Sequence, residues 1–147
     1  KEVSELKDEM ILIALHKIVK DLDHETMQIA GHYGLSFPQF MVLEALMHKD
    51  EMCIGDIKDT ILSSNGTIPV IIQNLEKQGL LKRRKNLNDR RKSMISLTAQ
   101  GRQIIEKIVP ENENMYRARF QIWSEEEKRT LIHLLNRYRQ IIETGDE

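Results

Sequence analysis

The chain has 147 residues, one cysteine and nearly balanced charge, with 22 Lys and Arg against 23 Asp and Glu. A chain of this length corresponds to one domain that buries a core without disulfides or metals, and 40% hydrophobic with 31% charged residues excludes a disordered chain. Its longest apolar run, Met10–Leu15, falls far short of the roughly 18 residues of a membrane span. No signal-peptide pattern is visible, and the lone Cys53 fits a reducing compartment, so we expect a cytoplasmic protein.

Two helices are predicted in the first third of the chain. Apolar residues at spacings of three and four predict a long helix from Ser4 to His32. The apolar run Met10–Leu15 makes this helix hydrophobic almost all round, which requires cover on two sides. A second helix is predicted after Ser36, because Ser36 and Gln39 have the spacing of a capping box.

Two shorter helices follow, separated by a turn. The spacing of isoleucines predicts a third helix over Ile54–Leu62 and a fourth that reaches Gln78. Proline is tolerated only in the first turn of a helix, where its missing N–H has no intrahelical partner. Pro69 therefore predicts that the fourth helix starts close to Asn65 or Gly66.

After Gly79, which is placed to stop the fourth helix, the pattern changes to that of strands. Leu80–Arg84 and Ser93–Leu97 are predicted strands of a hairpin. The stretch Lys82–Lys92 holds seven basic residues and one acid, a net charge of +6 in a chain of net charge −1. A solvated basic loop is the plain alternative, but such a local patch is also what attracts a polyanion.

The last third of the chain is predicted to be helical. Thr98 is placed to cap a fifth helix, which Pro110 is expected to kink or break. Ser124 and Glu127 have the spacing of a second capping box, and the sixth helix that they begin carries a broad apolar stripe over Leu131–Ile142. The fold class is therefore mainly α with a small β-hairpin.

Helix, turn, helix and hairpin is the order of a winged helix-turn-helix, in which the second helix of the pair enters the major groove of DNA. The outward positions of the fourth helix are polar, amide-rich and nearly free of acids, and Asn and Gln pair well with adenine edges. Any exposed helix face carries such residues, so this face points to DNA only in combination with the basic hairpin. The outward residues are Asn65, Thr67, Val70, Gln73, Asn74 and Lys77.

Three motifs in this order resemble the multiple-antibiotic-resistance regulator (MarR) family of bacterial transcription factors. They are Ser36–Phe40, Leu75–Leu81, and Asp89–Arg91 followed by Leu97–Gly101, which is similar to the wing signature of an acid and an Arg before Leu-Thr-x-x-Gly. The resemblance implies a homodimer built on the first, fifth and sixth helices that binds double-stranded DNA at a pseudo-palindromic operator. It also implies a repressor that a small-molecule effector releases.

The resemblance assigns roles residue by residue. Arg91 matches the wing arginine that contacts DNA, and Asp89 matches the acid that orients the wing by pairing with a neighbouring Arg. Ser64, Asn65, Thr67 and Gln73 fall where the family reads the groove. The full set of predicted DNA-binding residues is Ser64, Asn65, Thr67, Gln73, Asn74, Lys77, Arg84, Lys85, Arg90, Arg91 and Lys92. The fourth helix departs from the family because it has no Arg and carries Gly66 and Pro69 in its first turn, so we expect the wing to supply more of the affinity.

The same reasoning divides the chain into two regions of one continuous structural unit. Residues 35–98 form the predicted winged helix-turn-helix. Residues 1–34 and 99–147 form the predicted helical dimerisation region.

Sensing of oxidants or metals by a member of this family is an open alternative. The oxidant-sensing members resemble one another in a Cys on the first helix, whereas Cys53 lies before the third helix with nothing basic beside it. Polar residues of the first helix lack the spacing of metal ligands, so no metal and no cofactor is predicted. Those residues are His16, Asp21, His24, Glu25 and His32.

Two further questions concern the effector and the class of protein. Tyr33, Tyr116 and Trp123 are candidates to line an effector pocket, with packing as the favoured interpretation. A helical scaffold whose basic hairpin binds an acidic protein is the rival class. No phosphate loop, nucleophile elbow or paired-carboxylate pattern is visible, so no catalytic residues are predicted and the protein is not expected to be an enzyme.

Overall fold

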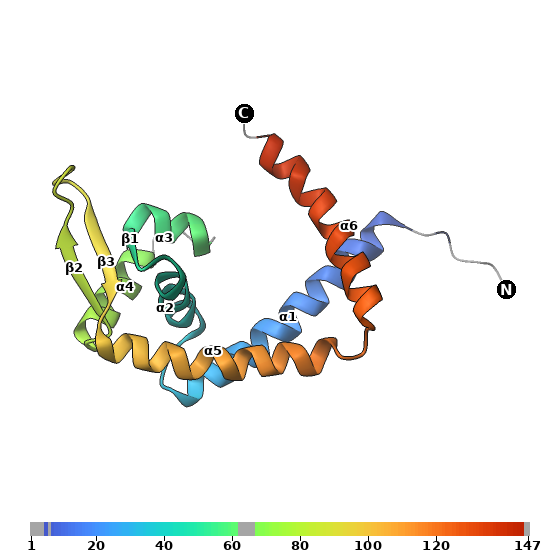
Figure 1. Cartoon of the computed structure of the whole chain (residues 1–147), viewed down its shortest axis with the longest axis horizontal. Helices are drawn as coiled ribbons and strands as arrows, with labels where there is room; N and C mark the ends of the chain where they lie inside the picture. Colours follow the sequence, from blue (N-terminus) through green and yellow to red (C-terminus); the bar gives the residue numbers. More distant parts are fainter. Residues whose placement is uncertain (1–4, 6, 62–66, 146–147) are drawn as a thin grey trace. The chain divides into compact units, whose positions relative to one another are not determined.

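The computed structural model describes residue 5, residues 7–61 and residues 67–145. The chain divides into two units, residues 1–113 and 114–147, and α5 runs from the first into the second. Within the described residues the elements are α1 (Asp8–His32), α2 (Phe37–Lys49), β1 (Glu51–Cys53), α3 (Ile54–Ile61), α4 (Ile68–Lys77), β2 (Leu81–Lys85), β3 (Ser93–Leu97), α5 (Ala99–Phe120) and α6 (Glu125–Thr144) (Figure 1).

Both predicted capping boxes are confirmed. At the start of α2, Ser36 Oγ accepts a hydrogen bond from the Gln39 N–H at 3.3 Å, and Gln39 Oε1 accepts one from the Ser36 N–H at 2.9 Å. At the start of α6, Ser124 and Glu127 exchange the same pair of bonds at 3.1 and 2.9 Å. Each box satisfies two backbone N–H groups that a helix end leaves without an intrahelical partner.

The predicted start of α4 is wrong by about two residues. Thr67 is the N-cap, so the helix begins at Ile68 and Pro69 occupies its first turn. The expectation that Pro69 lies in the first turn is confirmed. A proline can occupy more than one position of the first turn, however, so this rule does not fix the first residue of the helix. The predicted turn Ser63–Gly66 lies outside the described residues. The left-handed Gly79 stop is confirmed, with φ of +78°.

Pro110 was expected to kink or break the fifth helix, and the break is wrong, because α5 continues without interruption from Ala99 to Phe120. Proline removes one backbone hydrogen bond from a helix interior and strains the preceding turn. Here the residues on both sides are anchored by burial: Ile105 and Ile108 are fully buried and Asn112 is 2% exposed. Their packing outweighs the local cost of the proline.

The sheet has three antiparallel strands in the order β1-β3-β2. The predicted hairpin is confirmed, with Leu81 opposite Leu97 and Lys85 opposite Ser93. The edge strand β1 was not predicted, because three residues are too few to show the alternation of a strand. It pairs Met52 with Ile95 in β3 and so attaches the hairpin to the helices.

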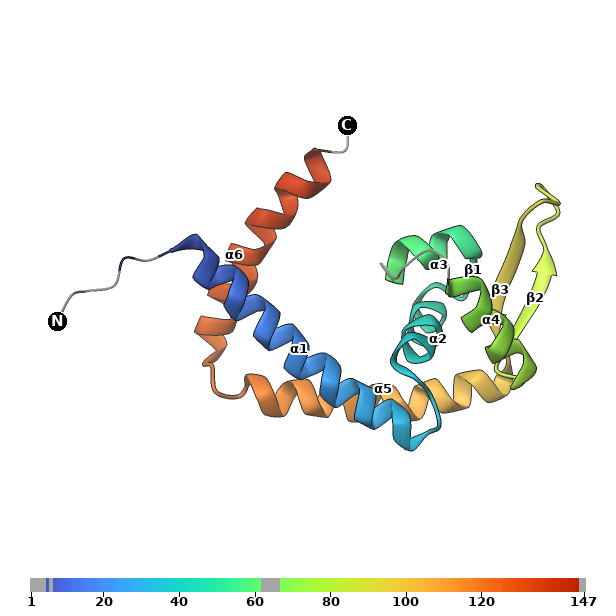
Figure 2. The ribbon, with the colours of Figure 1, turned by 180° about the vertical axis from the view of Figure 1, so that it is seen from behind.

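One core holds α2, α3, α4, the sheet and the first part of α5 together. The isoleucines whose spacing predicts the third and fourth helices lie in this core or pack against it, and the largest fully buried apolar side chains are Leu43, Leu46, Ile57, Ile68, Ile72, Leu75, Ile95, Ile105 and Ile108. The C-terminal part of α1 lies beside α5, as Figures 1 and 2 both show, and Thr26 Oγ1 donates a buried hydrogen bond to Asn112 Oδ1 at 2.7 Å.

The Leu-Thr-x-x-Gly motif fixes the start of α5. Thr98 Oγ1 accepts a hydrogen bond from the Gly101 N–H at 3.0 Å and donates one to the Gly79 carbonyl at 2.6 Å. The Thr98 N–H donates to the Leu80 carbonyl at 3.0 Å. A Cβ on Gly101 would lie 2.1 Å from that carbonyl oxygen, so only glycine lets the helix approach the backbone this closely.

Two helical surfaces remain apolar and exposed in the single chain. On α1, the side chains of Met10, Ile11, Leu12, Ile13 and Val19 are about half exposed or more. On α6, no described residue is buried, and the stripe Leu134, Leu135, Tyr138, Ile141 and Ile142 is exposed. Within the described ranges, no helix combines the length and the apolar character that crossing a bilayer requires.

Candidate nucleic-acid interface

The outward face of α4 presents the residues that were predicted to read DNA. Ile68, Ile72 and Leu75 are fully buried, and this anchoring turns the opposite side of the helix to solvent. Thr67, Gln73, Asn74 and Lys77 are exposed, and Val70 between them is 54% exposed. Ser64 and Asn65 lie outside the described residues. The described part of α4 therefore offers amides, a hydroxyl, a small apolar side chain and one cation on a single face.

The one acid on α4 is neutralised by the hairpin. Glu76 Oε1 accepts a hydrogen bond from Arg83 Nε of β2 at 3.1 Å and pairs with the same guanidinium through Nη2. This ion pair ties the hairpin to the helix beside it. It also removes an uncompensated negative charge from the neighbourhood of the exposed α4 face.

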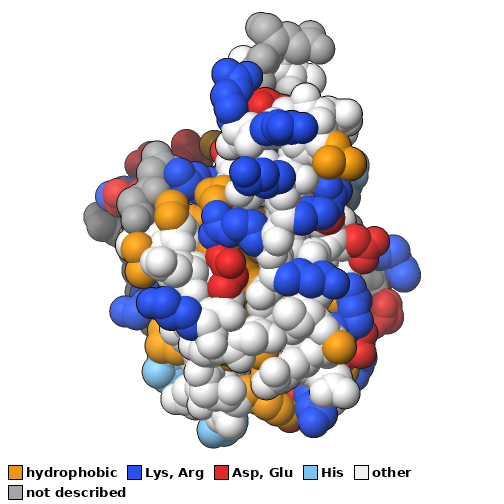
Figure 3. Space-filling model, turned by 90° about the vertical axis from the view of Figure 1, so that its left-hand side faces the viewer, with side chains coloured by type: hydrophobic (Ala, Val, Ile, Leu, Met, Phe, Trp, Pro, Cys, Tyr) orange, Lys and Arg blue, Asp and Glu red, His pale blue; other side chains and the backbone are white. Residues whose placement is uncertain are grey.

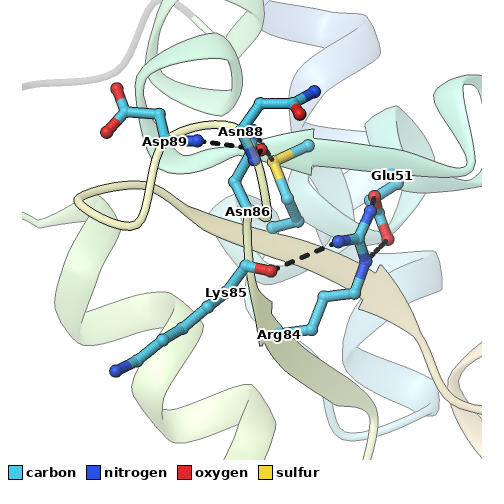
Figure 4. Close-up of polar contacts among 7 residues, drawn as sticks. Glu51, Arg84, Lys85, Asn86, Asn88 and Asp89 are labelled. Carbon is cyan, nitrogen blue, oxygen red and sulfur yellow. Dashed lines mark hydrogen bonds and ion pairs between the residues drawn. The ribbon is translucent and has the colours of Figure 1, made fainter.

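A second ion pair attaches the hairpin to the opposite edge of the sheet. Arg84 Nε donates to Glu51 Oε2 of β1 at 2.9 Å, Nη2 binds the other carboxylate oxygen, and Nη1 donates to the Lys85 carbonyl at 3.3 Å (Figure 4). The hydrogen bond to Glu51 raises the pKa of Arg84 above its ordinary value. The Arg84 side chain is still 55% exposed, so part of its guanidinium faces solvent.

The tip of the hairpin is an ordered turn. Asn86 Oδ1 accepts hydrogen bonds from the backbone N–H groups of Asn88 at 2.9 Å and Asp89 at 3.3 Å (Figure 4). Asn86 N–H donates to the Lys92 carbonyl and Lys92 N–H donates to the Asp89 carbonyl, both at 3.0 Å. A side-chain amide that replaces backbone partners in this way is a recurrent stabiliser of turns.

Asp89 and Arg91 form the pair that the family resemblance implies. Asp89 Oδ1 accepts from both the backbone N–H and the Nε of Arg91, at 3.1 and 3.2 Å. The side-chain bond, reinforced by the backbone bond, lowers the pKa of Asp89 below its ordinary value. The Arg91 side chain is 91% exposed, so the pair holds the base of the guanidinium and leaves its other donors available.

Four further basic residues of the hairpin are exposed. Lys82, Lys85, Arg90 and Lys92 form no ion pair among the residues that the structure describes, in contrast to Arg83 and Arg84. Figure 3, which faces the hairpin side, shows Lys and Arg side chains gathered there. The concentration of charge that the sequence shows is therefore also a concentration in space.

The residues considered for sensing do not gather into a site. Cys53 lies in β1 and is half-buried. No group of three His, Cys, Asp or Glu in the described ranges is placed to hold a metal ion, and His24 instead lies 3.0 Å from the Gln28 amide. Tyr33 bonds to Glu111, which raises the pKa of its hydroxyl. Tyr116 and Trp123 both stack on Phe120, at 6.4 and 5.5 Å between ring centroids.

Sequence reasoning missed the residues that hold the hairpin in place. Glu51 and Glu76 were not singled out, because each lies far from its arginine partner in the sequence or on another element. Asn86 is a common turn former by residue type, but the sequence does not show which backbone groups its amide binds. The signal that was available is charge alone: a basic strand that follows an acid-bearing helix invites an ion pair between them, as between Glu76 and Arg83.

Comparison with known proteins places the chain in a family. A family model described as transcriptional regulator SarA/Rot matches residues 25–108. The HTH-type transcriptional regulator MhqR of Bacillus subtilis (strain 168) is 30% identical over 128 residues, covering 86% of this chain and 88% of that protein. The chain belongs to the MarR family of winged helix-turn-helix transcriptional regulators.

Two solved structures show the same fold. A variant of MarR from E. coli, solved in complex with operator DNA, has a TM-score of 0.77 and 21% identity and covers 92% of this chain and 99% of that one. NadR, solved in complex with 4-hydroxyphenylacetate, has a TM-score of 0.77 and 24% identity and covers 96% and 99%. In MarR-family terms, the β2–β3 hairpin is the wing and α4 is the recognition helix.

Proposed function

We propose that this MarR-family protein is a cytoplasmic repressor that binds a pseudo-palindromic operator as a homodimer. The observation that carries the proposal is the charge arrangement of the wing. Glu51 and Glu76 are neutralised by Arg84 and Arg83. Four wing cations, Lys82, Lys85, Arg90 and Lys92, have no ion-pair partner among the described residues and lie on the hairpin beside the amide-rich face of α4. A polyanion that approaches this face meets net positive charge, although the whole chain has a net charge of −1.

The two elements have different tasks in this proposal. The recognition helix lies in the major groove, where Gln73 and Asn74 are suited to adenine, and Thr67 with Val70 to a thymine methyl. The wing lies along the backbone and in the adjacent minor groove, where negative potential attracts Arg91. Cations that contact phosphates set the register of the protein but carry no sequence information. We assign this task to Lys77, Arg84, Lys85, Arg90 and Lys92, and we assign groove contacts to Ser64 and Asn65, which precede the recognition helix in the sequence.

Dimerisation accounts for the apolar surfaces of α1 and α6. Contiguous exposed apolar side chains of this extent are unusual on a monomer and mark an interaction surface. They lie in residues 1–34 and 99–147, the region that we assign to dimerisation, and outside residues 35–98. A two-fold dimer presents two recognition helices to half-sites about one helical turn, ~34 Å, apart.

Release by a small molecule follows if the effector binds one spacing of the two recognition helices better than another. NadR, which has the same fold, was solved with 4-hydroxyphenylacetate bound. We propose the same class of regulation here, a small-molecule effector that shifts the dimer away from the spacing that fits the operator.

A footprint of the protein on the DNA upstream of its own gene, with and without candidate ligands, tests the proposal. We expect protection of two half-sites on one face of the duplex. A helical scaffold whose wing binds an acidic protein would protect no DNA, and that result would overturn the proposal.

The Gln73→Ala variant separates base reading from backbone contact. We expect it to reduce the preference for the operator over unrelated duplex by roughly tenfold, because a side chain that pairs with a base edge contributes about 1–3 kcal/mol of discrimination. Lys77→Ala is the matched comparison on the same face and should weaken binding to all duplexes alike. An equal weakening on every sequence for Gln73→Ala would show that Gln73 contacts only the backbone.

The double variant Leu135→Glu, Ile142→Glu tests the dimer surface. Both side chains belong to the exposed stripe of α6, and charges there would be buried without partners in a dimer interface. We expect the variant to be a folded monomer in analytical ultracentrifugation at micromolar concentration. Gln140→Glu, on the opposite face of α6, should leave the dimer intact; a double variant that remains dimeric would exclude this surface.

A further inference from the structure

Leu87 is an apolar residue in an unexpected place. It lies at the tip of the basic wing, and at 88% it is the most exposed of the large hydrophobic side chains among the described residues. It belongs to neither of the apolar surfaces of α1 and α6. Because so little of its surface is covered by the described part of the chain, its side chain is available to a partner.

The wing tip presents Leu87 from a fixed backbone. The residues on both sides are held, Asn86 by its bond to the Lys92 carbonyl and Asn88 by its bond to the Asn86 side chain. Asn86 Nδ2 also lies 3.7 Å from Met94 Sδ of β3, which connects the turn to the sheet (Figure 4). Because the backbone is already ordered, a partner that contacts Leu87 orders little more than one side chain.

The charge around Leu87 indicates the chemistry of this partner. Exposed cationic side chains lie on both sides of Leu87 in the sequence: Lys85 before it, and Arg90 and Lys92 after it. An apolar side chain on a hairpin that carries exposed cations fits a partner that is polyanionic outside and apolar within. The minor groove of DNA has this arrangement, with phosphates along its rims and deoxyribose walls between them. Apolar side chains of other minor-groove proteins enter between base steps in the same way.

We propose that Leu87 is a DNA-contacting residue that the wing inserts into the minor groove, against the sugar walls and the edge of a base step. The inference rests on the proposed function of the protein and extends it from the charged residues of the wing to an apolar one. Phosphate contacts by lysine and arginine release counterions and depend steeply on salt, whereas an apolar contact does not. Leu87 should therefore contribute affinity that high salt leaves in place.

The test is the dissociation constant of the full-length protein for duplex DNA that carries its footprinted site, measured from low to high salt. We expect Leu87→Ala to weaken binding about tenfold at every salt concentration, because both protomers of the dimer then bury less apolar surface against the DNA. Its plot of log Kd against log salt should run parallel to that of the wild type. Lys85→Ala should instead change the slope, by about 0.9 for each phosphate that is no longer neutralised. Leu87→Met is the conservative control and should stay within about twofold of the wild type, since Met keeps the apolar volume.

The outcomes are distinguishable. Wild-type protein that binds no duplex would contradict the proposed function itself. Wild-type binding with an unchanged dissociation constant for Leu87→Ala would overturn only the role of Leu87. If Leu87→Ala leaves DNA binding unchanged but abolishes binding to phosphatidylserine vesicles, the residue serves an anionic membrane surface and the inference is overturned. The wild type, Leu87→Ala and Leu87→Met should have equal melting temperatures, because the side chain at position 87 is exposed.

Discussion

The Arg91→Ala variant is expected to bind operator DNA at least about 30-fold more weakly than the wild type. The Arg91 side chain is 91% exposed and is oriented by two bonds to Asp89, so its remaining donors face solvent in a fixed direction. An arginine contact to DNA contributes about 1–3 kcal/mol, and a dimer makes it twice. The measurement is fluorescence anisotropy on the footprinted duplex at one defined salt concentration.

An effect on folding must be separated from an effect on DNA binding. Arg129→Ala on α6 removes the same charge from an exposed position outside the proposed interface and should leave affinity unchanged. Both variants should keep the oligomeric state and melting temperature of the wild type. Unaltered affinity for Arg91→Ala would contradict the assignment of the wing as a DNA-binding element.

Gly101→Ala is expected to destabilise the protein by about 3 kcal/mol or more. The added Cβ would lie 2.1 Å from the Leu80 carbonyl oxygen, and the neighbouring Leu80 backbone atoms are at 3.1 and 3.3 Å. Both sides of the contact are backbone, so neither yields by a change of rotamer; overpacking of this kind costs at least about 1–3 kcal/mol. The same shift would disturb the Thr98 bonds that fix α5 to the end of α4. Chemical denaturation monitored by circular dichroism gives the free energy of unfolding.

Gly31→Ala is the matched control for this prediction. Gly31 lies inside α1, and a Cβ there meets no atom within 4 Å. Because alanine favours the helix by about 0.5–1 kcal/mol over glycine, this variant should be as stable as the wild type or slightly more stable. If both glycine variants unfold at the same denaturant concentration as the wild type, the close approach at Gly101 does not determine the stability of the fold.

The sequence predicted those elements whose signals are local. Capping boxes at Ser36 and Ser124, the left-handed Gly79 and the inward stripes of α3 and α4 each depend on residues within one or two turns. The family resemblance added the roles of Asp89 and Arg91, for which the structure has a suitable ion pair.

The features that escaped prediction depend on contacts between distant residues. Strand β1 exists because β3 pairs with it, and three residues carry no periodic pattern of their own. Pro110 predicts a kink or a break in the fifth helix, but the break does not occur, because burial of Ile105 and Ile108 supports the helix across the proline. Similarly, the sequence shows Arg84 only as one of several cations of the hairpin, whereas in the structure it also pairs with Glu51, 33 positions away.

The dependence of duplex binding on salt tests the central claim most directly, namely that the basic wing lets a chain of net charge −1 hold DNA. If the assigned phosphate contacts, Lys77, Arg84, Lys85, Arg90 and Lys92, each neutralise one phosphate in both protomers, log K should fall with log salt with a slope of about −9. Replacing either Lys85 or Lys92 by Ala should make this slope shallower by about 2, because each replacement removes one phosphate contact from both protomers. Binding that is absent, or a slope near zero, would contradict the central claim.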